Sequence, residues 1–326
     1  RAPLPWAATK IDPRPPLAQC DSGASTLPEI MARCAPAPVA MRAAWIFDTM
    51  PPDPMPDDTP KDAATEMISD DLVAFADHLA DTARDLALRC FRQQLEVEYK
   101  SDDTPVTTVD REIEQALRQQ IADAYPAHSF IGEEFGPQDT ESPWSWVVDP
   151  IDGTKSFITG KPTFGSLIAL LHERTPVLGV IEIPALKERW VGNADRGTTC
   201  NHTTCQTSDT TMLADATLYA TTPDMFSASE EKRFDHLSQA TCFRVFGADC
   251  YAYGLLAAGH VDLVAEADMA PHDFLALVPV VEGAGGIITN WQGNPLDLHS
   301  SGQVLAAANT VLHEQALAQL DPTAVL

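Results

Sequence analysis

The sequence predicts an α/β protein in which helices and β-sheets form alternating layers. Three features of the hydrophobic pattern indicate this class. Two amphipathic helices are expected before residue 126, and five apolar strands follow between residues 130 and 191. Beyond residue 216 strands and helices alternate, which is the order that packed layers require. Several strands are continuously apolar, so we expect sheets that are covered on both faces.

The first two elements are predicted to be helices. Ser69 is a suitable N-cap, and Asp70 and Asp71 follow in the first turn, where the helix dipole favours negative charge. The apolar residues that then fall on one face are Leu72, Phe75, Leu79, Leu86 and Cys90. A second helix is expected after Thr107-Thr108, ending before Pro126. Residues 99–105, between the two helices, are predicted to form a polar loop.

The remaining elements follow from short apolar runs. Strands are predicted at residues 130–132, 146–148, 165–171, 178–183 and 188–191, with a hairpin turn at 185–187. The second half has predicted strands at 216–222, 243–246, 261–266, 287–289 and 306–308. The helices between and after them are expected at 229–240, 249–258, 273–283 and 311–320.

Composition excludes several classes of function. A formal net charge of −26 argues against a surface for nucleic acid or an acidic membrane, because such surfaces need basic patches. No apolar run approaches the roughly 18 residues of a membrane span. The seven cysteines show no zinc-like spacing, and their odd number fits a reducing compartment better than a disulfide framework. We therefore expect a soluble cytoplasmic protein, with import into an organelle as the open alternative.

Residues 1–60 differ from the rest of the chain. They are rich in proline and alanine and lack sustained periodicity. Such a segment buries too little apolar area to offset the entropy lost on ordering. We expect a disordered or extended N-terminal tail.

The most informative motif follows the apolar run at residues 144–148. It reads Asp149-Pro150-Ile151-Asp152-Gly153-Thr154. Proline fixes φ and glycine permits unusual backbone conformations, so the chain should turn sharply here. The turn can direct both carboxylates, the Ile151 carbonyl and the Thr154 hydroxyl to one point, and hard oxygen ligands suit Mg²⁺. The alternative is an acidic loop whose carboxylates are solvated.

Two further segments make the first interpretation more specific. They are His128-Ser129-Phe130-Ile131-Gly132-Glu133-Glu134 upstream and Pro271-His272-Asp273-Phe274-Leu275-Ala276-Leu277 downstream. Together with the central motif, they resemble the inositol monophosphatase superfamily of metal-dependent phosphatases. The resemblance implies an α-β-α-β-α sandwich with mixed sheets and a homodimer. It divides the chain into residues 61–200, with the metal site, and residues 201–326, which contribute Asp273 and substrate contacts.

The resemblance also assigns roles to single residues. Two or three Mg²⁺ ions would be held by Glu133, Asp149, the Ile151 carbonyl, Asp152 and Asp273. Glu133, Asp152 and Thr154 would be catalytic, with Thr154 orienting a water molecule and Glu133 accepting its proton. No phosphoenzyme is expected.

Several stretches are closest to histidinol-phosphatases, including residues 152–157, 246–254 and 277–286. Lys155 and His272 depart from the inositol phosphatases, which usually have a small hydroxyl residue and a tryptophan there. The resemblance therefore favours L-histidinol phosphate as substrate and a role in histidine biosynthesis. The expected substrate contacts are Gly153, Thr154, Lys155, Arg244, Gly247, Asp249, Glu266 and Asp273.

Structural alternatives accompany each of these roles. Glu133 could be a surface carboxylate, and Thr154 could stabilise its own turn. Asp273 and Asp249 lie at expected helix starts, where aspartate is usually a cap. Asp110 is interpreted as a first-turn acid that compensates the helix dipole. The rival functions are an inositol, sugar or nucleotide monophosphatase and a metal-binding scaffold without activity.

Overall fold

The computed structural model describes residues 68–94, 97–99, 105–193 and 195–321. These residues belong to one compact unit, residues 64–326. The tail expected at residues 1–60 lies outside the described residues.

Two helices form the first layer, as predicted. α1 (Asp70–Cys90) begins at Ser69, whose side chain accepts a hydrogen bond from the Leu72 amide. α2 (Thr108–Ala124) begins at Thr107 with a capping box closed by Asp110. The prediction of a loop at 99–105 is wrong at its two ends, because β1 (Val97–Tyr99) and β2 (Pro105–Thr107) pair as a short antiparallel hairpin.

The larger sheet has eight strands in the order β10-β9-β8-β7-β6-β5-β3-β4. It is mixed, because β3 and β5 pair in parallel whereas the other neighbouring strands of the described sheet pair antiparallel. The strands are β3 (Ser129–Gly132), β4 (Gly136–Gln138), β5 (Trp144–Asp152), β6 (Gly165–His172), β7 (Thr175–Ile183), β8 (Glu188–Asn193), β9 (Gly197–Cys200) and β10 (Thr203–Thr204). The five predicted strands are present, and the short strands β4, β9 and β10 were not predicted.

The smaller sheet has five strands in the order β12-β11-β13-β15-β14. Its strands are β11 (Thr217–Ala220), β12 (Phe243–Phe246), β13 (Leu263–Glu266), β14 (Ile287–Thr289) and β15 (Val304–Ala307). The helical elements around it are η1 (Leu213–Asp215), η2 (Pro223–Met225), α4 (Ala228–Ala240), α5 (Tyr251–Ala257) and α8 (Thr310–Leu320).

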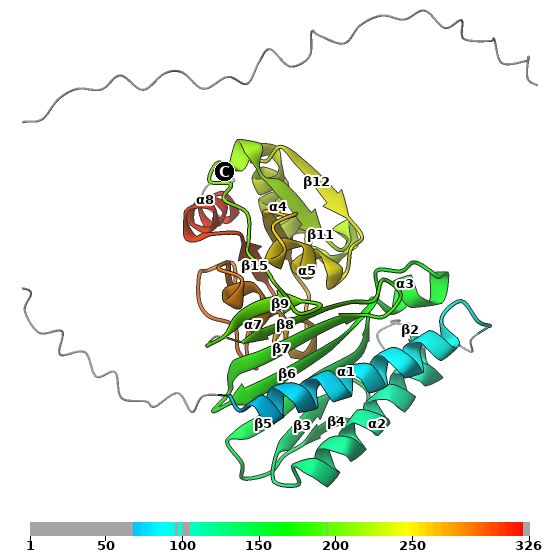
Figure 1. The fold of residues 1–326 in the computed structure, drawn as a ribbon. Coiled ribbons are helices and arrows are strands. Elements are labelled where there is room, and N and C mark those ends of the chain that lie inside the picture. The colour runs from blue at the N-terminus through cyan, green and yellow to red at the C-terminus, as the bar shows by residue number, and fades with distance from the viewer. Residues whose placement is uncertain (1–67, 95–96, 100–104, 194, 322–326) are drawn as a thin grey trace, which may run out of the picture. The chain divides into compact units, whose positions relative to one another are not determined.

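Strand alternation divides the buried residues among three cores and produces five layers (Figure 1). Trp146 and Val148 face α1 and α2, whereas Val147 between them faces α5, α6 (Pro271–Phe274) and α7 (Leu277–Gly283). Likewise, Val264 packs toward this central helix layer, while Leu263 and Ala265 pack toward α4 and α8. The α-β-α-β-α sandwich is confirmed.

The single helix predicted at 273–283 is wrong. The chain forms α6 (Pro271–Phe274) and α7 (Leu277–Gly283) instead. Pro279 lacks an amide hydrogen, so the carbonyl of Leu275 has no partner one turn later and the helix is interrupted. The interruption places Asp273 on a short separate helix.

Helix α7 lies directly on the larger sheet at two glycines. A Cβ added to Gly179 of β7 would stand 2.0 Å from the Ala276 carbonyl oxygen, and one added to Gly192 of β8 would stand 2.3 Å from the Val280 Cα. Only glycine permits this approach. The position of α6, and with it Asp273, therefore depends on these two strand residues.

Within the described residues, no helix combines the length and apolar character needed to cross a membrane.

Candidate active site

The end of β5 bears two aspartates that the backbone turns toward the same side. Asp149 pairs with Leu167 of β6, whereas Asp152, three residues later, pairs with Gly165, only two residues away. In a regular strand, residues three apart face opposite ways. The extra residue on β5 is a bulge, and it brings both carboxylates to one face of the sheet.

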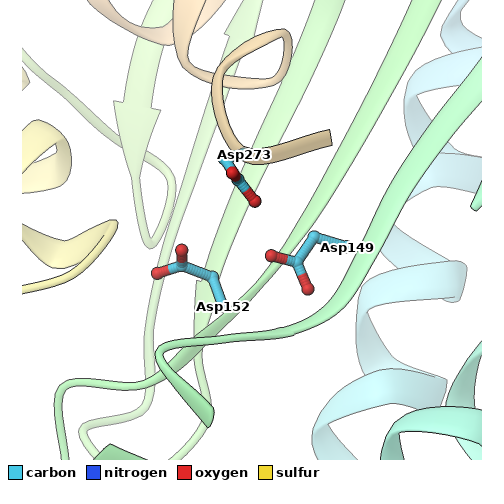
Figure 2. Close-up of side chains that lie close together, drawn as sticks. All are labelled: Asp149, Asp152 and Asp273. Atoms are coloured by element: carbon cyan, nitrogen blue, oxygen red, sulfur yellow. The ribbon is translucent and has the colours of Figure 1, made fainter. Parts of the chain in front are cut away.

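Asp273 joins these two aspartates from a distant part of the chain. One carboxylate oxygen from each of Asp149, Asp152 and Asp273 lies within 4.8 Å of the other two. Figure 2 shows the three side chains gathered around one point. Asp273 also accepts a hydrogen bond of 2.7 Å from the Ala270 amide at the start of α6. Its capping role and its place in the acidic group are therefore compatible, and not alternatives.

Glu133 reaches the same site through the register of the sheet. The parallel pairing of β3 with β5 matches Gly132 with Val148, so Glu133 and Asp149 follow at the same edge. The two carboxyl groups are within hydrogen-bonding reach, and Glu133 lines the cavity described below. The neighbouring Glu134 has a side chain that is only 3% exposed, so it does not face solvent.

Asp110 lies in the first turn of α2, as predicted. Its carboxylate accepts hydrogen bonds from the amide and the hydroxyl of Thr107, at 2.9 and 2.5 Å. Burial raises its pKa to about 6, with a smaller contribution from the charges of Glu133 and Glu134. Asp110 is thus part of a helix cap, and its pKa also depends on the charges of Glu133 and Glu134.

The acidic group opens into a cavity of about 540 Å³. One side is formed by the β5–α3 turn, where α3 (Thr154–Thr159) begins after Gly153 in a left-handed conformation. Gly153, Thr154, Lys155 and Ile151 all line the cavity. The Thr154 hydroxyl donates to the Ile151 carbonyl at 3.1 Å, so the turn-stabilising role is present in this structure.

Asp249, which follows strand β12 of the smaller sheet, packs against this turn. A Cβ on Gly153 would be 2.7 Å from the Asp249 Cγ, so glycine is needed for this close contact. The Asp249 carboxylate accepts hydrogen bonds from Ser156 at 2.6 Å and Thr163 at 3.1 Å. α5 begins two residues later with no side-chain cap, so the capping alternative for Asp249 is wrong.

The lining of the cavity also contains further acidic residues and two methionines. Glu266 is 2% exposed and accepts hydrogen bonds from the Thr221 amide and the Tyr253 hydroxyl, at 2.6 and 2.8 Å. Burial raises the pKa of Glu266 above its ordinary value. The lining also includes Met225, Asp268, Met269 and His272.

Two expected substrate contacts are not brought to the cavity. Neither Arg244 nor Gly247 lines it. Arg244 lies on β12 and forms an ion pair with Asp235 at 2.7 Å, which occupies its guanidinium at the surface. Of the four expected contacts Arg244, Gly247, Asp249 and Glu266, the last two line the cavity.

Some residues at the site were not found from the sequence. The Cys250 amide donates to Asp152 at 2.7 Å, and Asp268 and the methionines form part of the wall. Cys250 lies in a stretch that the family resemblance covers, but a backbone donor has no residue-type signal. Asp268 has a left-handed φ of 58°, which places it in a turn that periodicity does not reveal.

Electrostatic repulsion makes this group of carboxylates a good fit for a divalent cation. Burial raises the pKa of Asp149 well above its ordinary value, and the charges of Glu133, Asp152 and Asp273 raise it further. The pKa of Asp152 is raised by burial and by the charges of Asp249 and Asp273. Carboxylate oxygens are the donors that Mg²⁺ prefers, and its charge would offset the repulsion. The residues present could hold such an ion.

Similarity to known proteins assigns the chain to a family. Residues 69–323 match the sequence profile of the inositol monophosphatase family. The bifunctional phosphatase IMPL2, chloroplastic, of Arabidopsis thaliana is 43% identical over 261 residues, covering 77% of this chain and 75% of that protein. The histidinol-phosphatase of Mycobacterium tuberculosis is 36% identical over 263 residues, covering 78% of this chain and 99% of that protein.

Comparison with solved structures supports the same family. An inositol monophosphatase from Zymomonas mobilis has a TM-score of 0.71 and 42% identity, covering 77% of this chain and 97% of that one. The inositol monophosphatase of Anabaena (Nostoc) has a TM-score of 0.67 and 26% identity, covering 78% of this chain and 98% of that one. The chain is therefore a member of the inositol monophosphatase family of phosphatases.

Proposed function

We propose that this chain is a Mg²⁺-dependent phosphomonoesterase that hydrolyses L-histidinol phosphate in histidine biosynthesis. The observation that carries the proposal is the group formed by Asp149, Asp152 and Asp273, with Glu133 beside Asp149. Relatives named histidinol-phosphatase, at 34–36% identity, support the substrate. Uncatalysed hydrolysis of phosphate monoesters is among the slowest reactions known, so a large electrostatic contribution is required.

The acidic group would bind two or three Mg²⁺ ions through Glu133, Asp149, the Ile151 carbonyl, Asp152 and Asp273. When bound, Mg²⁺ supplies the positive charge that a phosphate needs and makes coordinated water more acidic. Glu133 would accept a proton from water, a role supported by its position in the cavity lining next to Asp149. Thr154 can orient that water if its hydroxyl turns from the Ile151 carbonyl, 3.1 Å away.

The acidic residues in the cavity lining favour a cationic alcohol. Asp268 and the buried Glu266 present carboxyl groups there, and Asp249 closes the adjoining side. Histidinol carries an ammonium group and an imidazole, so carboxylates complement its charge. Met225 and Met269 provide soft apolar surface that suits an aromatic ring. Inositol is neutral and gains nothing from the carboxylate charges, which makes inositol 1-phosphate the second candidate.

A phosphate-release assay with and without Mg²⁺ tests the proposal. The substrates are L-histidinol phosphate, inositol 1-phosphate and a nucleoside monophosphate at equal concentrations. We expect Mg²⁺-dependent turnover with L-histidinol phosphate preferred. Preference for inositol 1-phosphate would refute L-histidinol phosphate as the substrate. Absence of turnover with every phosphomonoester would favour the alternative of a metal-binding scaffold without activity.

Asp152→Asn tests the ligand role. It retains the shape of the side chain and removes its charge, so we expect activity to fall by at least about 10²-fold, the order found for loss of one preorganised charge-stabilising group. Asp235→Asn is the matched control, because Asp235 is paired with Arg244 outside the cavity. An active Asp152→Asn variant would refute the proposed role.

Two further features stay proposals. We propose a homodimer, which light scattering of the purified chain would test. The plant relative is named chloroplastic, which supports organellar import as the alternative to a cytoplasmic location. Imaging of the full chain fused to a fluorescent protein, in the cells it comes from, distinguishes the two.

A further inference from the structure

A buried glutamate in α2 binds the turn that follows β3. Glu114 is fully buried, with 0% exposure. Its Oε2 accepts a hydrogen bond of 2.6 Å from the Glu134 amide, and its Oε1 accepts one of 3.1 Å from the Phe135 amide. A carboxylate that accepts two consecutive backbone amides forms charge-assisted bonds, which are stronger than neutral ones. The proposed reaction does not use Glu114 directly.

Arg118, one helical turn further along α2, completes the attachment. Its guanidinium donates to Glu114 Oε1 at 3.0 Å and to the carbonyl of Gly136 at 2.8 Å. The guanidinium also lies 4.3 Å from the centre of the Phe130 ring, which limits its movement. The pair therefore binds the β3–β4 turn through its amides and through its carbonyl.

Gly132 provides an independent observation on the same contact. A Cβ at this position would lie 2.1 Å from Glu114 Oε1 and 2.2 Å from its Cδ. The carboxylate thus occupies the space where any other residue would have its side chain. Glu133 therefore lies between Gly132, which contacts Glu114, and Glu134, whose amide donates to Glu114.

We propose that Glu114, supported by Arg118, is a positioning residue that sets the direction of Glu133 toward the metal site. The inference rests on the proposed function, since it assigns Glu133 to metal binding. The turn has three residues, because β3 ends at Gly132 and β4 begins at Gly136, and Glu133 is the first of them. Fixing the backbone on both sides of Glu133 places its carboxylate beside Asp149 before a cation arrives, and outer partners of this kind typically change metal affinity by 10- to 100-fold.

Glu114→Gln tests this role with little change in shape. Its amide presents one acceptor oxygen, and its NH₂ group would face a backbone amide hydrogen. Binding of Mn²⁺, followed by electron paramagnetic resonance without substrate, is the first readout. We expect about 10- to 100-fold weaker Mn²⁺ binding, a lower kcat and a smaller change in the KM for L-histidinol phosphate.

Glu182→Gln is the matched control. Glu182 is also fully buried and is paired with two arginines, Arg84 and Arg189, at 2.6 Å each. Both variants should lower the melting temperature, but only Glu114→Gln should weaken Mn²⁺ binding. Equal loss of Mn²⁺ affinity in the two variants would show a merely structural role and overturn the proposal, as would unchanged affinity in Glu114→Gln.

A second variant covers the case in which Glu114→Gln does not fold. Arg118→Met leaves the two amide bonds of Glu114 and removes the bond to the Gly136 carbonyl, so a smaller loss of Mn²⁺ affinity is expected. Unchanged affinity in this folded variant would then overturn the proposal. Wild-type chain that binds Mn²⁺ but hydrolyses no phosphomonoester would overturn the proposed function alone, because the binding test of Glu114 does not need turnover.

Discussion

Gly179→Ala should damage the proposed metal site through helix α7, which packs against Gly179. The new methyl carbon would stand 2.0 Å from the Ala276 carbonyl oxygen, whereas real Cβ atoms essentially never come closer than 3.0 Å to another heavy atom. Helix α7 and the strand must therefore move apart by about 1 Å. Asp273 precedes Ala276 by three residues and will move with it.

The expected cost has two parts. Overpacking a well-packed core typically costs about 1–3 kcal/mol, which lowers the melting temperature of a domain this size by roughly 2–4 °C per kcal/mol. Mg²⁺ requires near-octahedral ligands at about 2.0–2.1 Å, so a shift of about 1 Å removes Asp273 from useful geometry. Misplacement on this scale can reduce activity by about 10²-fold.

The assay combines thermal denaturation with phosphate release at increasing Mg²⁺ concentration. Leu312→Ala is the control, because Leu312 is fully buried in the separate core beneath α8. That change should cost about 2–5 kcal/mol without altering the Mg²⁺ requirement. If Gly179→Ala loses stability and keeps the wild-type Mg²⁺ dependence and kcat, the link from α7 to Asp273 is refuted. Unchanged stability would refute the packing argument itself.

Three further predictions concern charge. At 100 times its dissociation constant, Mg²⁺ should stabilise the chain by about 2.7 kcal/mol, seen as a higher melting temperature that a chelator reverses; no shift would contradict a metal site. Asp268→Asn should reduce kcat/KM for L-histidinol phosphate about two- to fivefold and leave inositol 1-phosphate unchanged, as expected for an exposed charge pair; equal effects on both substrates would exclude recognition of the ammonium group. Burial lowers the pKa of His313 from 6.5 to about 4, so the folded chain binds fewer protons than the unfolded chain between these values. Stability that is present above pH 6.5 is therefore lost as pH falls toward 4, by up to about 3 kcal/mol. The His313→Gln variant can keep the bond to Thr289. Its free energy of unfolding, measured in urea, should fall less between pH 7 and pH 4 than that of the wild type; an identical pH dependence would contradict the assignment.

The sequence predicted best what depends on local pattern. The bounds expected for β12 and β14 agree with the structure, and the Ser69 cap begins α1 as expected. These features depend on neighbouring residues, whose spacing the chain itself displays. The family resemblance added the layer order, which periodicity alone could not provide.

Features that depend on contacts between distant residues could not be predicted from the sequence. The bulge that turns Asp149 and Asp152 to one face is defined only by the pairing of β5 with β6. The contact between Glu114 and the β3–β4 turn joins residues about twenty apart through a side chain that reads as an ordinary helix acid. The ion pair that occupies Arg244 is equally invisible, because Asp235 has no distinguishing spacing.

The three aspartates share a property that would favour binding of a cation. Each has one oxygen bound to a backbone amide: Asp149 to Ile151 at 3.0 Å, Asp152 to Cys250 at 2.7 Å and Asp273 to Ala270 at 2.7 Å. Such bonds fix the direction of a carboxylate, so the three cannot turn apart to relieve their repulsion. A proton or a cation must then offset it, which is why burial and neighbouring charge raise the pKa of Asp149 and Asp152. Because little ordering would remain to be done on binding, the repulsion among these carboxylates would contribute directly to the affinity for the proposed Mg²⁺.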